Sequence, residues 1–450
     1  MQTDIDPKEP IKVDNQPKKT KKKNKDAFAG YLLVAPALIL ILAISIWPVF
    51  QSFYFSLFDL QLNEPTKSSV HLDYQIDLDR YLQNYPFLIG AIDSEINKGN
   101  SSEELTAIKS TLEDLDAGIK EEPKAEDNYD KINEKLDKFE NIPDDMKYVE
   151  IDEKVAEDFT TSVKGINEDL KTINESGNME QGDKIVGLSS ALTEIVVKPN
   201  FIGLDHYKDN LTDQRMWKSL WNTSVFTFIS VLAELLLGLA IALLINKAFL
   251  GRGLIRASIL IPWAIPTAVA AMMWKFLYDG QNGIVAKLFE DFGLVDRMSM
   301  LLTTDTGAMF SVIFADVWKT TPYMALLLLA GLQTIPSSLY EAAAIDGANK
   351  WKQFVTVTLP LLKTSLLVAL LFRTLDAFRV FDLIFVLTGG GPANSTETIS
   401  MLAYKTMFKQ TDFGDGSAIS VIVFLCVAII SGIFIKLLGS ELISDGTGKK

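Results

Sequence analysis

Six ionisable side chains interrupt two otherwise apolar stretches, residues 308–332 and 365–387: Asp316, Lys319, Arg373, Asp376, Arg379 and Asp382. A mid-membrane charge costs roughly 2.5 to 3.5 kcal/mol on insertion scales, so six charges facing lipid would cost on the order of 15 to 20 kcal/mol. They must face protein or water. Three acids and three bases sum to zero, and a neutral cavity rich in donors and acceptors suits a polyhydroxylated sugar better than an ion. Charges paired with one another for structural reasons would give the same pattern.

The two stretches belong to a set of runs long enough to cross a membrane. Runs of about 20 nearly uncharged residues span a hydrocarbon core of roughly 30 Å as helix. Six are present, at residues 31–54, 220–246, 257–277, 308–332, 365–387 and 418–438. A cleaved signal peptide is the alternative for the first run, but the run is too long for an h-region and no A-x-A-like site follows. The sequence therefore predicts an all-α membrane protein with six transmembrane helices. Glu234 is the single acid of the second run, and we expect an interhelical hydrogen bond there rather than a proton relay.

Basic residues set the expected orientation. The positive-inside rule places an amino terminus with this charge in the cytoplasm, owing to Lys18, Lys19, Lys21, Lys22, Lys23 and Lys25. Six crossings return the carboxyl terminus, with Lys449 and Lys450, to the same side. The segment between the first two runs then lies outside the cytoplasm.

That outward segment is strongly acidic. Residues 61–200 hold 32 acidic and 15 basic residues, a net charge of −17, whereas the whole chain carries −14. This balance argues against nucleic acid as a partner. Apolar residues recur at steps of three and four within 105–119 and 155–173, so we expect a folded helical insert. A partly disordered or solvated spacer is the alternative.

Residues for other chemistries are scarce. Cys426 is the only cysteine, so a disulfide framework or multi-cysteine metal site is excluded, and His71 and His206 are too isolated to predict a histidine metal site. The only Gly-Lys near a nucleotide-binding loop is Gly448-Lys449, and position 443 is Ile where that loop requires Gly. We expect no catalytic residue, no metal and no bound cofactor on this chain.

The stretch EAAAIDGANKWKQFVTVTLPLL, residues 341–362, stands between the fourth and fifth apolar runs. Its small side chains let another protein approach the backbone closely, while Leu339, Phe354, Val357 and Leu359 offer apolar anchors. These features indicate a docking helix. An amphipathic helix lying on the lipid surface is the alternative, which Lys350 and Lys352 would also suit.

The same stretch resembles the EAA loop of permease subunits in binding-protein-dependent ABC importers, through Glu341, Ala342, Ala343, Asp346, Gly347, Ala348, Leu359 and Pro360. FIGLDHYKDNL, ILIPWAIPTAVAAMMWKFLYDGQNG and VLTGGGP resemble the carbohydrate-uptake branch, in particular its MalF-type subunit, which also carries a large extracytoplasmic insertion. The resemblance covers about residues 27–61 and 201–440. It implies a coupling helix in a cleft of an ATPase subunit. Glu341 would pair there with a basic residue, Gly347 would permit the turn, and Pro360 would stop the helix before the fifth span.

The resemblance also implies a sugar site, at Asp316, Lys319, Thr320, Tyr323, Arg373, Asp376, Ala377 and Val380. The maltose type carries mostly amides and aromatics at these places, so the charges here put maltose itself in doubt more than sugars as a class. Steps of three on a helix drift by about 60° each, so Arg373 and Asp382 cannot both sit on one narrow face, and we expect some of these charges to contact neighbouring helices.

The implied function is ATP-driven import of a sugar, such as a maltodextrin, across a bacterial or archaeal plasma membrane. The implied partners are a second permease subunit forming a heterodimer, two ATPase subunits that use ATP and Mg²⁺, an extracytoplasmic sugar-binding protein, and the lipid bilayer. An ion-coupled secondary transporter or channel is the alternative, although no internal repeat of the kind common in those proteins is visible. A surface receptor is a third, but six spans are more than an anchor needs.

The expected organisation follows from these inferences. Residues 1–26 form a cytoplasmic basic tail, 27–60 the first transmembrane helix, and 61–205 an extracytoplasmic acidic helical insert. Residues 206–440 form the permease core with transmembrane helices two to six and a coupling loop at 339–362, and 441–450 a cytoplasmic tail.

Overall fold

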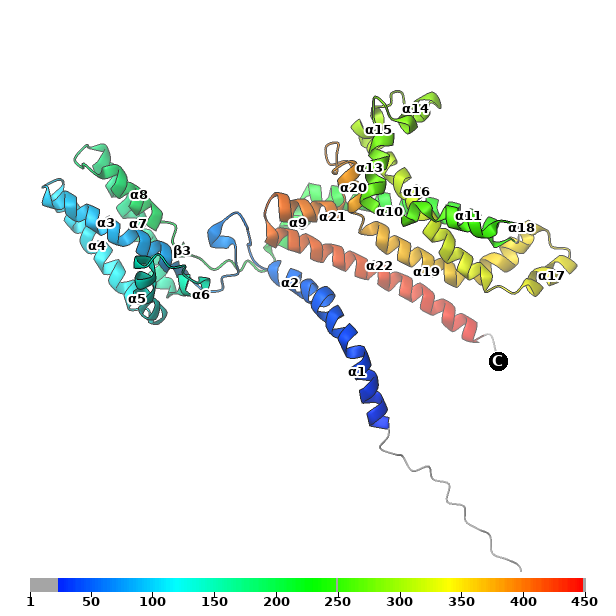
Figure 1. Ribbon diagram of the computed structural model, residues 1–450, viewed down its shortest axis with the longest axis horizontal. Coiled ribbons are helices and arrows are strands. Elements are labelled where there is room, and N and C mark those ends of the chain that lie inside the picture. The colour runs from blue at the N-terminus through cyan, green and yellow to red at the C-terminus, as the bar shows by residue number, and fades with distance from the viewer. Residues whose placement is uncertain (1–22, 248–249, 448–450) are drawn as a thin grey trace, which may run out of the picture. The chain divides into compact units, whose positions relative to one another are not determined.

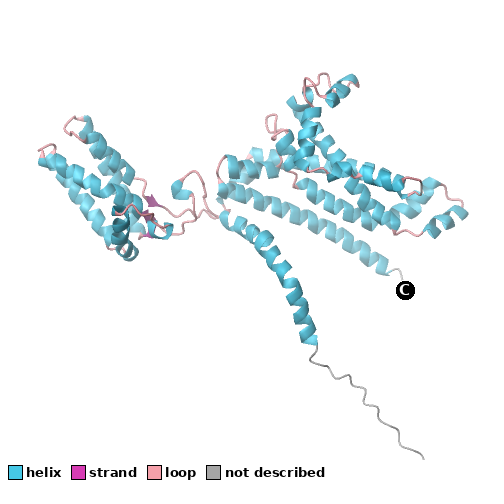
Figure 2. Ribbon diagram, in the orientation of Figure 1, coloured by secondary structure: helices cyan, strands magenta, loops and turns pink. Residues whose placement is uncertain are grey.

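The computed structural model of the protein describes residues 23–247 and 250–447, and these are overwhelmingly helical (Figures 1 and 2). The expectations that rest on Lys18, Lys19, Lys21, Lys22, Lys449 and Lys450 lie outside the described residues. The chain divides into two units, residues 1–52 and 53–450, which are described separately.

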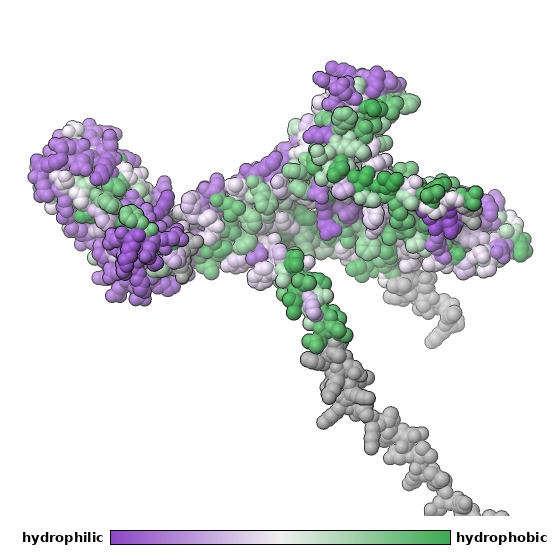
Figure 3. Space-filling view, in the orientation of Figure 1, coloured by the Kyte–Doolittle hydropathy of each residue, from purple (hydrophilic) through white to green (hydrophobic). Residues whose placement is uncertain are grey.

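The first unit is one long apolar helical segment. It consists of α1 (Lys23–Ile41), the π-helical turn η1 (Leu42–Ile46) and the start of α2 (Trp47–Phe55). Residues Tyr31–Phe55 have a mean hydropathy of 2.5, and none of the most apolar part is buried against protein (Figure 3). Leu, Ile and Ala dominate this stretch, so a hydrocarbon surrounding is the one in which such a surface is stable.

The acidic insert forms a helical unit with a core of its own. Its helices are α3 (Leu78–Asn97), α4 (Ser102–Lys120), α5 (Pro123–Asp137), α6 (Asp144–Lys147), α7 (Glu153–Glu175) and α8 (Gly182–Leu192). The 3₁₀ turn η2 (Pro65–Lys67) precedes them. The expected helices over 105–119 and 155–173 are α4 and α7, and their apolar residues lie in one buried cluster. The insert is therefore folded rather than a solvated spacer.

A small antiparallel sheet closes the insert, which the sequence did not predict. Strands β1 (Gln75–Asp77), β2 (Tyr148–Glu150) and β3 (Val196–Val197) lie in the order β2-β1-β3. Gln75 pairs with Val197, so the first and last residues of the insert's sheet lie side by side. Strands of two and three residues are too short for an alternating hydrophobic pattern to mark them.

Five helices among the described residues are long and apolar enough to cross a membrane: Tyr31–Phe55, Gln214–Asn246, Asp305–Gln333, Lys350–Phe378 and Phe413–Gly439. The last four include α10 (Gln214–Asn246), α16 (Asp305–Gln333), α19 (Leu359–Phe378) and part of α22 (Phe413–Thr447). The predicted span at 257–277 instead consists of α11 (Arg252–Ile259), α12 (Ile261–Ala264) and α13 (Thr267–Leu277). Pro262 and Pro266 account for these breaks, because proline removes a backbone donor and disfavours helical geometry at the preceding residue. A count of six spans therefore remains a prediction.

Shorter elements join the long helices. They are α9 (Asp205–Thr212), α14 (Ile284–Asp291), α15 (Met300–Thr303), α17 (Ser337–Ile345), α18 (Lys350–Gln353), the π turn η3 (Phe354–Thr358), α20 (Asp382–Leu387), α21 (Ile399–Tyr404) and the π turn η4 (Lys405–Lys409). The core cluster lies among α10, α16 and α19. Gly238 of α10 allows a close approach to α16, since a Cβ at this position would lie 2.8 Å from Met324 Cγ.

Candidate translocation site and coupling loop

Three packed helices bring the intramembrane charges together. α10 supplies Glu234, α16 supplies Asp316 and Lys319, and α19 supplies Arg373 and Asp376. Each of these helices is apolar along most of its length, so the polar residues are conspicuous exceptions. The first four side chains are buried, with Glu234 at 0% and Arg373 at 1% exposure.

Arg373 is the centre of this group. Its Nε donates to Oε2 of Glu234 at 2.5 Å and its Nη2 donates to Oε1 of the same residue at 2.9 Å. Nη2 also donates to Asp316 Oδ2, and Nη1 donates to Asp376 Oδ2 at 3.0 Å. A guanidinium presents a rigid fork that matches carboxylates in this bidentate way. All three nitrogens are therefore engaged by acids from three helices.

This arrangement bears on two of the expectations from the sequence. The interhelical bond expected at Glu234 is confirmed, and its partners are Arg373 and the hydroxyl of Thr320, which donates to Oε1 at 2.7 Å. Part of the intramembrane charge is thus paired within the chain. With Glu234 included, the seven charges sum to −1 rather than to zero.

A cavity of about 300 Å³ lies beside this group of charges. It is lined by Trp263, Thr267, Asp316, Lys319, Thr320, Arg373, Asp376, Ala377, Arg379, Val380, Phe381, Asp382 and Leu383. Seven of the eight predicted site residues line it. The eighth, Tyr323, is not part of the lining but stacks on Trp263 with ring centroids 5.5 Å apart.

The sequence reasoning did not single out Trp263 and Thr267 as site residues. Both stand beside the breaks between α12 and α13, where Ile265 has an extended backbone. Two prolines within six residues of an apolar run were the available signal, because interrupted helices expose backbone groups where they line a cavity. Lys319 Nζ lies 3.4 Å from the carbonyl oxygen of Trp263 at this break.

A second break explains how Arg373 and Asp382 reach the same cavity. The sequence argument assumed a continuous helix over 365–387, and that assumption is wrong. α19 ends at Phe378, and α20 begins at Asp382 after Phe381, whose φ of −137° and ψ of −63° are not helical. The break redirects the chain, so the constraint of one narrow helical face does not apply.

The predicted coupling loop is a short helix followed by a glycine turn. α17 carries Glu341, and Gly347 follows it with φ +79°, a left-handed conformation that favours glycine. Asn349 then caps α18 by accepting a hydrogen bond from the Lys352 backbone N–H at 2.8 Å. The predicted coupling residues from Glu341 to Ala348 are all exposed or half-buried. Ile345 is 87% exposed and Trp351 72%, a surface that burial by a partner would stabilise.

Pro360 does not stop the helix before the fifth span, contrary to the sequence prediction. α18, η3 and α19 follow one another without a gap, and residues Lys350–Phe378 form one helix. Proline removes one backbone donor and crowds the carbonyl four residues earlier. The π-helical turn Phe354–Thr358 directly before it accommodates that mismatch.

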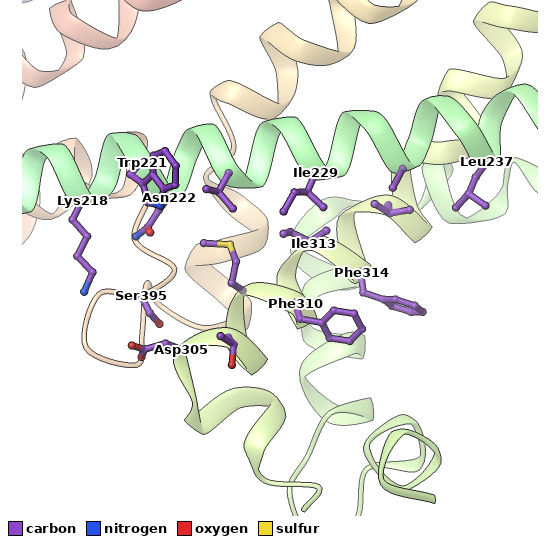
Figure 4. Close-up of a pocket in the computed structure, with 15 residues that line it drawn as sticks. Lys218, Trp221, Asn222, Ile229, Leu237, Asp305, Phe310, Ile313, Phe314 and Ser395 are labelled. Carbon is purple, nitrogen blue, oxygen red and sulfur yellow. The ribbon is translucent and has the colours of Figure 1, made fainter. Parts of the chain in front are cut away.

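Another groove has a different character. It occupies about 680 Å³ between α10 and α16 and is lined mainly by apolar side chains such as Ile229, Leu237, Phe310 and Phe314 (Figure 4). Lys218, Asp305 and Ser395 lie at one end of it (Figure 4).

Among the described residues, no group of His, Cys, Asp or Glu is arranged to hold a metal ion.

Residues 234–442 match the family model described as binding-protein-dependent transport system inner membrane component. The trehalose/maltose transport system permease protein MalF of Thermococcus litoralis is 46% identical over 251 residues, which cover 56% of this chain and 84% of that protein. The chain belongs to this family of ABC importer permeases. The trehalose transport system permease protein SugA of Mycobacterium tuberculosis is 46% identical over 240 residues, covering 53% of this chain and 76% of SugA.

A solved bacterial ABC transporter involved in the import of the acidic polysaccharide alginate has a chain that is 21% identical to this permease, with a TM-score of 0.49. The match covers 53% of this chain and 84% of that chain, and a similarity of this size carries no argument about the site.

Family membership confirms several expectations. The resemblance to permease subunits of carbohydrate ABC importers is confirmed. The chain is a multi-pass membrane protein and a transport component rather than an enzyme. It works with a binding protein and with an ATPase that supplies the energy.

Proposed function

We propose that this permease carries a neutral sugar, a glucose disaccharide or a short maltodextrin, through the cavity between α12, α13, α16 and α19. The observation that carries the proposal is the lining of that cavity: charged donors and acceptors surround an aromatic face. Relatives named for trehalose and maltose transport support this substrate class.

The lining suits a polyhydroxylated ring. Lys319 and Arg379 offer donors, while Asp376, whose side chain is 68% exposed, and Asp382 offer acceptors. Trp263 is 46% exposed and held in place by Tyr323 behind it, so its face can cover the apolar C–H side of a pyranose. Polar groups at the edges and an aromatic floor are the usual parts of a small-molecule site.

The size of the cavity fits one or two sugar rings. At about 300 Å³ it is near the lower end of the roughly 300 to 1,000 Å³ typical of ligand pockets. A second permease subunit, in a heterodimer, supplies the opposite wall and any room for a longer maltodextrin. The eight residues predicted from the sequence belong to this chain's share of the site, seven of them in the cavity lining and Tyr323 through its stacking on Trp263.

The coupling loop transmits the driving force. Two ATPase subunits bind ATP and Mg²⁺, and this chain binds neither. One ATPase receives the loop 339–362 in a cleft, where Glu341 meets a basic residue. The small surface of Ala342, Ala343, Asp346, Gly347 and Ala348 permits close contact, and Leu359 and Pro360 lie where the loop helix continues into α19. Closure of the ATPases is thereby coupled to movement of Arg373 and Asp376 on the same helix.

The orientation follows from the charge pattern. Both termini and the loop 339–362 face the cytoplasm of a bacterial or archaeal cell, and the insert 61–205 faces outward, where it helps to receive the sugar-loaded binding protein. The tails 1–26 and 441–450, helix 27–60 and core 206–440 are the remaining parts of this organisation.

The proposal is tested in proteoliposomes that hold this permease with its second subunit, ATPases and binding protein. Uptake of radiolabelled trehalose or maltose should require ATP and every component. Asp376→Asn should reduce uptake strongly, because it removes a charged acceptor that is exposed in the cavity. Lys208→Gln, an exposed residue of α9 away from the cavity, serves as the control. Unaltered uptake by the Asp376 variant would count against this cavity as the path.

A further inference from the structure

The proposed sugar cavity leaves the role of Glu234 unexplained. This carboxylate does not line the cavity, yet it is fully buried in a transmembrane helix and bonded to two residues that do line it. A buried acid in a membrane helix is costly to retain. Replacing a whole buried ion pair such as Glu234–Arg373 by apolar residues of similar volume is often neutral or stabilising, so packing alone does not account for the pair.

We infer that Glu234 is a positioning residue for sugar translocation, which holds the Arg373 guanidinium back from the substrate and thereby fixes the carboxylates of Asp316 and Asp376. The inference rests on the proposed function of the cavity and names a residue beyond those that touch the sugar.

The hydrogen-bond accounting supports this role. Glu234 accepts from both Nε and Nη2 of Arg373, at 2.5 and 2.9 Å, which fixes the plane of the guanidinium. The far edge of that plane then meets Asp316 Oδ2 and Asp376 Oδ2. One oxygen of each aspartate is engaged in this way, and the side chain of Asp376 stays 68% exposed in the cavity, where its other oxygen can accept from a sugar hydroxyl. Arg373 itself has little donor capacity left for the substrate, so it acts as a support.

Glu234 is also bonded to α16, through Thr320. Its hydroxyl donates to Glu234 Oε1 at 2.7 Å, and Thr320 lines the cavity. Glu234 therefore touches one cavity residue on each of two helices. If α10 moved relative to α16 or α19, this carboxylate would shift the two cavity residues that it contacts.

Replacement of Glu234 by Gln has a defined consequence. Glutamine keeps the size and one acceptor oxygen, but its NH₂ group would face an N–H of Arg373, donor against donor. The guanidinium loses its two-point attachment and turns toward the cavity. A mere loss of stability would reduce the amount of assembled complex, whereas loss of positioning should reduce sugar moved per ATP hydrolysed.

The test is therefore the ratio of sugar uptake to binding-protein-stimulated ATP hydrolysis, measured on the same proteoliposomes with the complete assembly. In Glu234→Gln this ratio should fall by about ten-fold, since misplacing a site group by about 1 Å can cost about 100-fold. Glu234→Asp keeps the charge but is one methylene shorter, and it should give an intermediate ratio. If the Gln variant fails to assemble, the ratio measured for Glu234→Asp still tests the positioning role.

Glu397 supplies a matched control. It is also 0% exposed and accepts two hydrogen bonds from one arginine, Arg215 Nε at 2.8 Å and Nη2 at 2.9 Å, but it lies away from the cavity. Glu397→Gln should lower the yield of assembled complex while its uptake and hydrolysis change together. A normal ratio in every assembled Glu234 variant, with a reduced ratio in Asp376→Asn, would overturn the positioning role alone. A normal ratio in the Asp376 variant as well would overturn the cavity itself.

Discussion

The hydroxyl of Tyr340 lies 3.0 Å from Oγ1 of Thr358, 18 residues along the chain. This hydrogen bond joins α17 to the end of the π-helical turn and closes the loop that carries Glu341 and Gly347. The loop is thereby fastened to the helix that continues to Arg373. If the loop moves with the ATPase as proposed, we expect this helix to carry the movement to the cavity.

Tyr340→Phe should weaken that fastening without removing the ring. Loss of one hydrogen bond of this kind costs about 0.5 to 1.5 kcal/mol, so the chain should fold and assemble. We expect ATP hydrolysis to continue while less sugar is moved per ATP. Thr358→Val should behave in the same way, and the double variant should be no worse than either single change, because both remove one interaction. Additive losses would show that the two residues act separately.

Gly347→Asp should prevent association with the ATPase or uncouple it. No atom lies within 4 Å of a Cβ built at this glycine, so the side chain meets no obstacle within the chain itself. We expect the new side chain to clash with the ATPase subunit instead. Gly251 is the control, since it also has a left-handed backbone, φ +85°, and open space around it. Co-purification of the ATPase should be lost in Gly347→Asp and kept in Gly251→Asp, and equal retention in both would contradict the docking role.

Glu95 predicts a pH dependence in the insert. Burial disfavours its ionisation, but hydrogen bonds from the Asn100 side chain and from the backbone N–H groups of Glu180 and Gln181 outweigh burial and lower its pKa. A carboxyl whose pKa is lower when folded stabilises fully above its unfolded pKa of about 4.3 and loses that contribution as pH falls through the folded value.

Glu95→Gln should therefore destabilise the insert by about 1 to 3 kcal/mol at neutral pH, the usual cost of leaving buried partners unsatisfied. The difference from the unaltered chain should shrink as the pH falls below about 4. Pulse proteolysis of the full chain measures this, with the exposed Glu103→Gln as control. A difference that is constant with pH would show that ionisation is not involved.

Removal of the insert tests its proposed role in receiving the binding protein. Gln75 pairs with Val197 across the sheet, and the insert has its own core. Replacing residues 75–197 by a short Gly-Ser linker should therefore leave the remaining chain able to fold and to bind the ATPase. We expect a higher concentration of loaded binding protein to be needed for half-maximal uptake. Unchanged uptake and unchanged affinity for the binding protein would refute the role.

The sequence predicted which residues line the cavity better than it predicted their partners. Five of the seven predicted residues that line the cavity, Asp316, Lys319, Thr320, Arg373 and Asp376, are polar exceptions to an apolar pattern, and such exceptions are visible one residue at a time. The other two, Ala377 and Val380, were predicted from the family resemblance alone. The pairing of Glu234 with Arg373 joins residues 139 positions apart, and it depends on which helices pack together. The period of apolar residues indicates which face of a helix is buried, but it does not indicate which other helix packs against that face.

Breaks and irregular turns in the helices were the other feature that the sequence did not fully predict. The breaks at Pro262 and Pro266 had a local signal, but the break at 379–381 contains no proline or glycine. Pro360 misled the prediction in the opposite direction, because proline is compatible with a helix when a π turn precedes it.

The path of the sugar can be tested by photolabelling. A diazirine-bearing trehalose or maltose would be trapped in the complete assembly with a non-hydrolysable ATP analogue and irradiated, and the labelled peptides identified by mass spectrometry. We predict label on peptides that contain Trp263, Asp316 or Asp376, reduced by excess unlabelled sugar. Label confined to other segments, such as the apolar groove around Phe310 and Phe314, or label unaffected by competing sugar, would contradict translocation through this cavity.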